Sequence, residues 1–280
     1  MKFSKNERPL ATLVLGGNGK TGRRVVERLS QQGIPHRIGS RSGNPAFDWM
    51  DQATWKPALQ GMDAVYITFQ PDLAVPGTPE IITAFTKKAV QSGVRKLVLL
   101  SGRGEEEARK CESLIIGSGV DWTIVRCSWF SQNFSEGFLL DPILAGSVAL
   151  PVGNIGEPFV DVDDIADVVT AALTEQGHDG QLYELTGPGL LTFEQAVHEI
   201  ARATGRKIEF VPVSAEQYTE ALVALHIPPE YVEFINYLFT EVMDGRNAYL
   251  TDGVQKALGR PPRDFSRYVS ETAATGVWAI

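Results

Sequence analysis

The sequence predicts an α/β protein with a doubly wound parallel sheet and a smaller C-terminal α/β region. Short apolar runs alternate with helical patterns through the first half of the chain, as strand–helix–strand repetition requires. A glycine-rich turn joins the first apolar run to the first helical pattern, and prolines and glycines become denser from about residue 150. We therefore expect a first domain over residues 1–150. Residues 151–280 are expected to form a smaller region packed on the C-terminal edge of the sheet.

The strands are predicted from apolar runs of the length that buried parallel strands have. The first is Leu10–Leu15, which ends at Gly16. The others are expected at residues 35–39, 47–49, 63–67, 96–100 and 122–125. Helices are predicted between them at residues 20–32, 81–91 and 105–116. Crossovers of this length favour parallel strands with helices on both faces of the sheet.

The later elements are predicted to be helices over residues 163–173 and 192–204 and a strand over residues 181–185. Asp163 is expected to cap the first of these helices, and Thr192 with Gln195 fits a capping box for the second. Aromatic residues then recur at helical spacing over residues 229–243. Such a segment either packs in the core or forms a wall of an apolar pocket, and the sequence leaves both alternatives open.

Composition and charge exclude several classes of protein. The chain has 280 residues with 26 Lys and Arg against 34 Asp and Glu, a formal net charge of −8, which argues against nucleic acid as the main partner. Two cysteines are too few for a disulfide framework, so a reducing cytoplasm is expected. The N-terminal residues have no secretory signal, and no apolar stretch approaches the roughly 20 residues of a membrane helix. No membrane association is therefore expected.

The glycine-rich turn reads Gly16-Gly17-Asn18-Gly19-Lys20-Thr21-Gly22. It matches G-x-G-x-x-G between a predicted strand and a predicted helix, the context in which this motif binds a dinucleotide. One glycine permits the tight turn, one lets the backbone approach a pyrophosphate, and Gly22 lets the helix pack closely on the sheet. A triphosphate-binding loop ending at Gly19-Lys20-Thr21 would need glycine where the sequence has Val14, so phosphoryl transfer is excluded.

The end of the second predicted strand discriminates between the two dinucleotides. The segment from His36 to Ser42 has no acidic residue to bind the ribose 2′-hydroxyl of NAD. Arg41, with Ser40 beside it, is instead suited to a 2′-phosphate by its charge and planar geometry. The sequence therefore favours NADP(H) over NAD(H).

Six stretches of the sequence carry a resemblance to a known family. They are the Gly16–Gly22 turn, Gly61–Tyr66, Ser118–Arg126, Ser128–Asn133, Phe159–Ala166 and Tyr183–Pro188. Together they resemble the NmrA-like group of atypical short-chain dehydrogenase/reductases. The resemblance covers nearly the whole chain and implies a Rossmann fold. This group includes NADPH-dependent reductases, among them quinone and dye reductases, and regulatory proteins that bind the dinucleotide without known turnover.

The resemblance also implies which residues contact the cofactor. They lie at the carboxyl ends of the predicted strands, where ligands bind in open parallel sheets. Asn18, Gly19, Lys20 and Thr21 would surround the pyrophosphate, Arg41 the 2′-phosphate, Asp48 and Trp49 the adenine edge, and Thr68, Phe69 and Gln70 the adenosine ribose. Ser101 and Gly102 would lie beside the nicotinamide ribose, and Cys127, Ser128 and Trp129 near the nicotinamide amide.

The chain departs from the wider superfamily at the catalytic pair. Typical members use Tyr-x-x-x-Lys, in which the lysine lowers the pKa of the tyrosine that acts as general acid. Aligning Glu112 with the glutamate that usually follows this lysine places Ala108 at the lysine and Gly104 at the tyrosine. No tyrosine in the sequence has a lysine four residues later. Alcohol–ketone chemistry by the usual route is therefore not expected.

The remaining reactive residues indicate no second site. The four histidines are scattered without the spacing of metal ligands, so no metal is expected. Cys127 follows a buried strand and is expected to pack as a small apolar residue rather than to react. Arg103 and its charged neighbours are predicted to form a solvated helix face, with Arg103 alone in reach of the nicotinamide side.

Two functions remain open. The first is an NAD(P)H-dependent oxidoreductase that delivers hydride to an apolar or conjugated small molecule, such as a quinone, with solvent as a source of the proton. The second is a non-catalytic sensor of NADP(H) that acts through a protein partner. The missing tyrosine–lysine pair favours the sensor, and an aromatic pocket over the nicotinamide would favour the enzyme.

Overall fold

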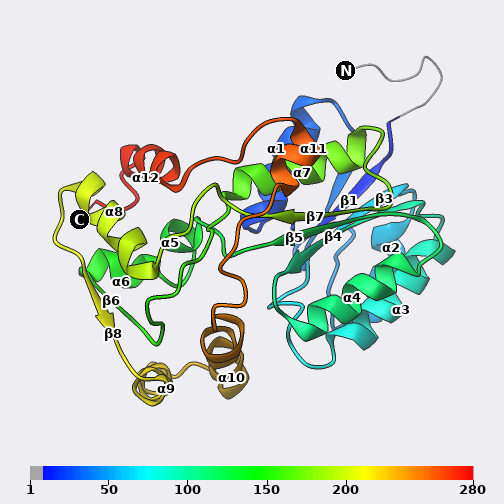
Figure 1. The fold of residues 1–280 in the computed structure, drawn as a ribbon. Helices are drawn as coiled ribbons and strands as arrows, with labels where there is room; N and C mark the ends of the chain where they lie inside the picture. Colours follow the sequence, from blue (N-terminus) through cyan, green and yellow to red (C-terminus); the bar gives the residue numbers. More distant parts are fainter. Residues whose placement is uncertain (1–8, 280) are drawn as a thin grey trace.

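Six parallel strands form the main sheet of the computed structural model, which describes residues 9–279 (Figure 1). Their order is β2-β1-β3-β4-β5-β7, so the chain adds β2 on one side of β1 and the later strands on the other. Ligands bind at such a reversal of strand order, outside the carboxyl ends of the strands. The predicted doubly wound sheet is confirmed. The strands are β1 (Thr12–Leu15), β2 (His36–Gly39), β3 (Ala64–Ile67), β4 (Lys96–Gly102), β5 (Asp121–Cys127) and β7 (Gln181–Leu185).

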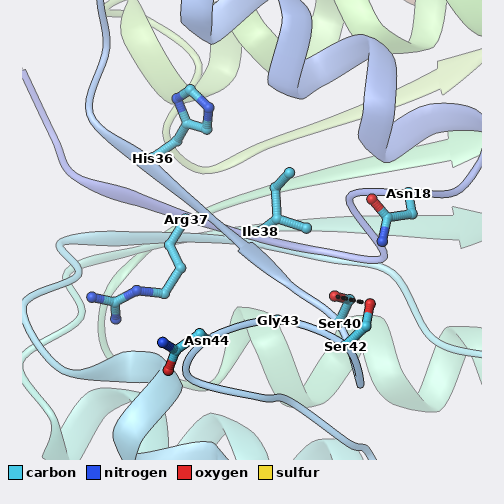
Figure 2. A pocket seen from close by; sticks show the side chains of 8 residues that line it. All are labelled: Asn18, His36, Arg37, Ile38, Ser40, Ser42, Gly43 and Asn44. Atoms are coloured by element: carbon cyan, nitrogen blue, oxygen red, sulfur yellow. Dashed lines mark hydrogen bonds between the residues drawn. The ribbon is translucent and has the colours of Figure 1, made fainter.

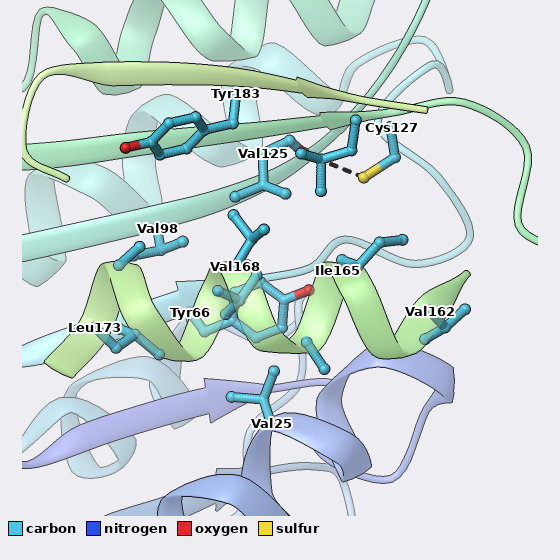
Figure 3. Close-up of a cluster of buried hydrophobic side chains, with 14 of the residues drawn as sticks. Val25, Tyr66, Val98, Val125, Cys127, Val162, Ile165, Val168, Leu173 and Tyr183 are labelled. Atoms are coloured by element: carbon cyan, nitrogen blue, oxygen red, sulfur yellow. Dashed lines mark hydrogen bonds between the residues drawn. The ribbon is translucent and has the colours of Figure 1, made fainter. Parts of the chain in front are cut away.

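Helices cover both faces of this sheet, because its strands are apolar on both sides. Leu13 and Leu15 of β1 belong to one apolar core, and Val14 between them belongs to the other. In Figure 3, Val168 of α7 points toward Val125 on the strand above it. Helices α1 (Lys20–Gln31), α7 (Val162–Thr174) and α11 (Gly253–Leu258) lie on that face, and α2 (Trp55–Leu59), α3 (Thr78–Gln91) and α4 (Glu106–Ile116) lie on the other.

A smaller part of the molecule lies beyond the carboxyl ends of the strands and has an apolar core of its own (Figure 1). Its two-stranded parallel sheet pairs β6 (Ser147–Leu150) with β8 (Glu209–Pro212). Strand β7 belongs to the main sheet and helix α7 packs on it, although both follow residue 150 in the sequence. The domain boundary expected at residue 150 stays a prediction. The helices here are α5 (Asn133–Glu136), α6 (Leu140–Ala145), α8 (Phe193–Thr204), α9 (Ala215–Ala224), α10 (Pro229–Tyr237), its π-helical continuation Leu238–Val242, and α12 (Phe265–Ala274).

The predicted short strand at residues 47–49 is wrong. These residues make only an isolated bridge between Asp48 and Asp51 and then enter the 3₁₀ turn Gln52–Thr54. The carbonyl of Asp48 accepts hydrogen bonds from the Thr54 hydroxyl at 3.2 Å and the Trp55 indole at 2.8 Å, which folds the chain back on itself. The apolar residues that suggested a strand pack in an aromatic cluster instead, with Phe47 and Trp49 5.0 Å apart edge to face.

The helix caps agree with the prediction in one case and differ in the other. Thr192 and Gln195 form the predicted capping box of α8. The N-cap of α7 is Asp161 rather than Asp163, and its carboxylate accepts a hydrogen bond from the Asp163 amide at 2.7 Å. The Asp163 carboxylate is instead held by Arg28 of α1 at 2.8 Å, which ties the two helices together. The expected absence of a secretory signal concerns residues 1–8, which lie outside the described part of the chain.

Candidate functional site

Three glycines of the glycine-rich turn lie where a side chain would clash with neighbouring atoms. Gly16 has φ of +62°, in the left-handed region, and a Cβ there would lie 2.3 Å from the Thr68 hydroxyl oxygen. A Cβ on Gly22 would lie 2.2 Å from the Gly16 carbonyl oxygen, and one on Gly17 would lie 2.8 Å from Ile38. Gly19 caps α1 without any side-chain hydrogen bond, so the first N–H groups of this helix are free for an anion. The turn therefore fits a pyrophosphate.

A cleft of about 590 Å³ runs from this turn along the carboxyl ends of β1, β3, β4 and β5. It is lined by most of the residues that the sequence predicts at the cofactor, and their contact with a cofactor stays a prediction. These are Gly16, Asn18, Gly19, Lys20, Thr21, Thr68, Phe69, Gln70, Ser101, Gly102, Cys127, Ser128 and Trp129.

Basic side chains gather at the glycine-turn end of the cleft. Burial is the main cause that lowers the pKa of Lys20, and Glu136 opposes this effect. Glu136 binds Arg24 at 2.8 Å and also pairs with Arg23. These two cations outweigh the effect of burial and lower the pKa of Glu136, so its carboxyl group stays ionised. The lining of this end of the cleft thus includes two cations, Lys20 and Arg23, against the Glu136 carboxylate, a balance that favours a phosphate group.

A second, shallower hollow continues from Asn18 past the end of β2 (Figure 2). The hydroxyls of Ser40 and Ser42 lie near Asn18 in this view, whereas the Arg37 side chain points away from them. Arg37 donates a hydrogen bond to the Ala58 carbonyl at 2.7 Å, so its guanidinium is held by the protein backbone. Arg41 lies on the exposed loop between the two serines. In the described residues no hydrogen bond or ion pair holds its guanidinium.

Four of the predicted residues line neither hollow nor cleft through their own atoms: Gly22, Arg41, Asp48 and Trp49. Gly22 packs against the backbone of Gly16 and Gly17. The Trp49 indole donates to the Thr68 carbonyl at 3.1 Å and packs 5.0 Å from the Phe69 ring, so it holds the loop that borders the cleft. The Asp48 carboxylate accepts from the Met50 amide at 2.9 Å, a local turn contact.

Ser101 lines the cleft, and its hydroxyl is hydrogen-bonded within the protein. It donates to the Glu112 carboxylate at 2.6 Å, and Arg126 donates to the same oxygen at 2.9 Å. Arg126 also binds Glu184 at 3.1 Å, which in turn binds Arg103 at 3.0 Å. This network of hydrogen bonds and ion pairs joins α4, β4, β5 and β7 and fixes the position of the Ser101 hydroxyl. The predicted solvated face does not include Arg103, which is 4% exposed and lines the cleft.

The structure describes the surroundings of the two positions that the sequence alignment assigns to the catalytic pair. Gly104, which the alignment places there, has φ of +78°, and a Cβ would lie 2.4 Å from the Asn247 side-chain nitrogen. Ala108, at the position of the lysine, is fully buried. A larger side chain at either position would require the neighbouring side chains to move.

Two buried carboxyl groups in the cleft were not anticipated from the sequence. Glu105 lies against Gly102, and burial, with the charge of Asp72 next in importance, raises its pKa well above the usual value. Glu157 is 2% exposed, and burial raises its pKa to about 7 although the Trp129 amide and Arg103 favour the ionised form. No motif marks Glu157 in the sequence, because it lies in a loop 30 residues from β5.

Glu157→Gln is expected to remove a pH dependence of stability. Because the Glu157 pKa rises from 4.5 to about 7 on folding, the folded state holds this proton more tightly than the unfolded state. The resulting stabilisation is present below about pH 4.5 and is lost as the pH rises through about 7. Calorimetry should therefore show that the melting temperature of the unmodified protein falls relative to that of E157Q by on the order of 5 °C across this range. Parallel pH responses of the two proteins would contradict it.

The far end of the cleft is aromatic. The Trp129 ring packs 5.2 Å from Phe239 and 6.5 Å from Phe138, and Phe234 and Leu238 line the cleft beside it. Phe239 is 3% exposed and packs in the core, whereas Phe234 and Leu238 line the cleft. The segment at residues 229–243 therefore contributes some residues to the core and others to the wall of the cleft. Planar, apolar molecules suit such a lining.

The described residues include no helix with the length and apolar character needed to cross a bilayer. From residue 9 to 279, no three His, Cys, Asp or Glu side chains gather in a group that could hold a metal ion. Burial raises the pKa of the Cys127 thiol, which therefore stays protonated.

Comparison with known proteins identifies the family. The NAD(P)H-binding family model matches residues 16–176, more than half of the chain. The chain is 30% identical to Prestalk A differentiation protein A of Dictyostelium discoideum, over 94% of its own length and 92% of that protein. It is also 30% identical to agroclavine dehydrogenase of Claviceps fusiformis, over 97% and 99%.

The fold is similar to that of an NADPH-dependent quinone oxidoreductase of Escherichia coli, solved in complex with NADPH. The TM-score is 0.78 at 20% sequence identity, and the match covers 93% of this chain and 99% of that one. The cradle at Gly16–Gly22 and the open sheet edge beside it agree with the family match. The chain therefore belongs to the NAD(P)H-binding family of Rossmann-fold proteins, in the NmrA-like group of atypical short-chain dehydrogenase/reductases.

Proposed function

We propose that this protein is an NADPH-dependent reductase that transfers hydride to a planar, conjugated acceptor such as a quinone. The observation that carries the proposal is the continuous cleft, which joins a pyrophosphate cradle at one end to an aromatic wall at the other. The bound cofactor would supply the hydride. The chain positions the acceptor between Trp129 and Phe234, and the smaller C-terminal part forms the substrate side.

The preference for NADP(H) over NAD(H) is supported by the hollow beyond β2. Asn18, Ser40 and Ser42 line it, no acidic residue does, and Arg41 lies on the same loop. A 2′-phosphate there would meet hydroxyl, amide and guanidinium donors, whereas the 2′-hydroxyl of NAD would find no carboxylate.

A cytoplasmic location and a small-molecule substrate complete the proposal. Cys111 and Cys127 are free and buried, as in proteins of a reducing compartment. The net charge of −8 is unfavourable for nucleic acid. Agroclavine dehydrogenase is by its name a redox enzyme acting on a small molecule, and it aligns with this chain over nearly its full length.

The test is a titration of the purified protein with NADPH and NADH, followed by cofactor fluorescence. Quinones and conjugated carbonyls are then added while absorbance of the reduced nicotinamide is recorded. Tighter binding of NADPH and acceptor-dependent loss of the absorbance are the expected results. Failure to bind either cofactor would overturn the proposal.

A second candidate is a non-catalytic NADP(H) sensor that acts on a protein partner. It is favoured by Gly104, a residue without a proton-donating side chain at the position of the superfamily's usual general acid. A relative over nearly the full chain is named for a role in differentiation rather than for a reaction. NADPH binding without turnover of any acceptor in the same titration would favour this sensor over the enzyme.

A further inference from the structure

Glu157 is a buried carboxyl group held in a fixed place at the cleft. Its backbone pairs with Leu191 in both directions, with N···O distances of 2.9 and 3.0 Å. Its Oε1 accepts a hydrogen bond from the Trp129 amide at 3.1 Å. Across the described residues its carboxyl has no other hydrogen-bond donor, so Oε2 is free to hold a proton.

The position of Glu157 relates it to the aromatic end of the cleft. Trp129 connects the two, since its amide holds the Glu157 carboxyl and its ring forms the wall with Phe239 and Phe138. Glu157 also lines the cleft together with Cys127 and Ser128 at the end of β5. A molecule stacked on the aromatic wall would therefore have this carboxyl beside it.

We propose that Glu157 is the general acid of the reductase, taking the place of the missing tyrosine. This inference rests on the proposed function. The acceptor gains two electrons and one hydrogen as hydride from the reduced cofactor, which is oxidised. The oxygen that becomes negative then takes the Glu157 proton: its O–H bond forms as the Glu157 O–H bond breaks. The carboxylate regains its proton from water in the open cleft.

The charged and titratable groups around Glu157 agree with this assignment. The positive charge of Arg103 favours the ionised form of Glu157 and so lowers its pKa. Because Arg103 is itself paired with Glu184 at 3.0 Å, this effect is partly neutralised. Burial dominates and raises the Glu157 pKa to about 7, so both protonation states are accessible near neutral pH.

The other protonated groups of the cleft are less suitable. Burial raises the pKa of the Cys127 thiol far above neutrality, so it gives up its proton poorly. The carboxyl of Glu105 is hydrogen-bonded to Asp72 and lies against Gly102, so its proton is engaged between two carboxyl groups. The resemblance assigns Lys20 to the pyrophosphate, and its ammonium lies beside Gly137, where burial and the charges of Glu136 and Arg23 act on its pKa.

The experiment compares Glu157→Gln and Glu157→Asp with the unmodified protein. Glutamine keeps an acceptor for the Trp129 amide but has no acidic proton, and aspartate keeps the proton on a shorter side chain. Glu199→Gln is the matched control, because Glu199 on α8 also has a raised pKa caused by burial but lies outside the cleft. The readouts are NADPH affinity, the pH profile of kcat, and the infrared band of protonated carboxyl groups in the protein without cofactor.

We expect E157Q to bind NADPH as the unmodified protein does but to lose roughly a hundredfold in kcat. In the unmodified protein kcat should fall as the pH rises through about 7, because the acid form is required. E157Q should lose this dependence, and Glu157→Asp should partly restore both kcat and the pH profile. The infrared band that titrates near neutral pH should be absent from E157Q and present in Glu199→Gln.

Two results would overturn the inference while leaving the reductase in place. One is a kcat and pH profile of E157Q equal to those of the unmodified protein. The other is an infrared spectrum in which no carboxyl band depends on Glu157. Absence of NADPH binding or of turnover in the unmodified protein would instead overturn the proposed function, and with it this role of Glu157.

Discussion

Gly22→Ala is expected to abolish useful binding of the dinucleotide. The new Cβ would lie 2.2 Å from the Gly16 carbonyl oxygen and 2.8 Å from the Gly17 Cα, and both are backbone atoms that cannot rotate away. The turn must therefore move by about an ångström, which misplaces the N–H groups at the start of α1. We expect NADPH affinity to fall by roughly a hundredfold or more and stability to fall by about 1–3 kcal/mol. Fluorescence titration and urea unfolding measure the two effects.

Gly189→Ala is the matched control for this variant. Gly189 is exposed, and a Cβ there would meet nothing within 4 Å. The same chemical change should leave both affinity and stability near those of the unmodified protein. An affinity of Gly22→Ala within a fewfold of the control would show that the pyrophosphate does not lie on this turn.

Arg41→Ala is expected to weaken NADPH binding selectively. Hydrogen bonds to charged groups contribute about 1.5–3 kcal/mol each, so losing the guanidinium should reduce NADPH affinity by roughly tenfold to a hundredfold. NADH lacks the 2′-phosphate, so its affinity should remain unchanged. Fluorescence titrations with both cofactors at one ionic strength measure the ratio.

Arg109→Ala controls for the change in net charge. Arg109 is exposed on α4 and lines neither the cleft nor the hollow beyond β2. This variant should bind both cofactors normally. Equal weakening of NADPH and NADH by Arg41→Ala would mean that Arg41 does not recognise the 2′-phosphate, and the preference for NADP(H) would lose its main support.

The sequence predicts the main sheet well because its signals are local. Each buried strand is a short apolar run, and each face of the sheet needs apolar residues, as the alternation of Leu13, Val14 and Leu15 between two cores shows. The glycine turn is similarly local, since the steric constraints at Gly16 and Gly22 come from residues close in the sequence or from the adjacent strand.

The sequence fails where tertiary contacts decide the outcome. The apolar pattern at residues 47–49 has the period of a strand, but an aromatic cluster with Phe85 and Trp55 holds those side chains instead. Glu157 shows the same limit for the site. Its burial and its contact with the Trp129 amide depend on a loop that returns to the end of β5 only in the folded chain.

The course of the chain between the two parts of the molecule has a consequence for how the protein can move and be divided. After β5 the chain enters the smaller part, returns with α7 and β7, leaves again for α8 to α10, and returns once more with α11 before α12 (Figure 1). The chain thus crosses between the two parts several times, instead of once through a single linker. A fragment cut at residue 150 would lack α7 and expose Val98 and Val125 to water. The cleft is therefore braced on several sides, and wide hinge opening is unfavourable.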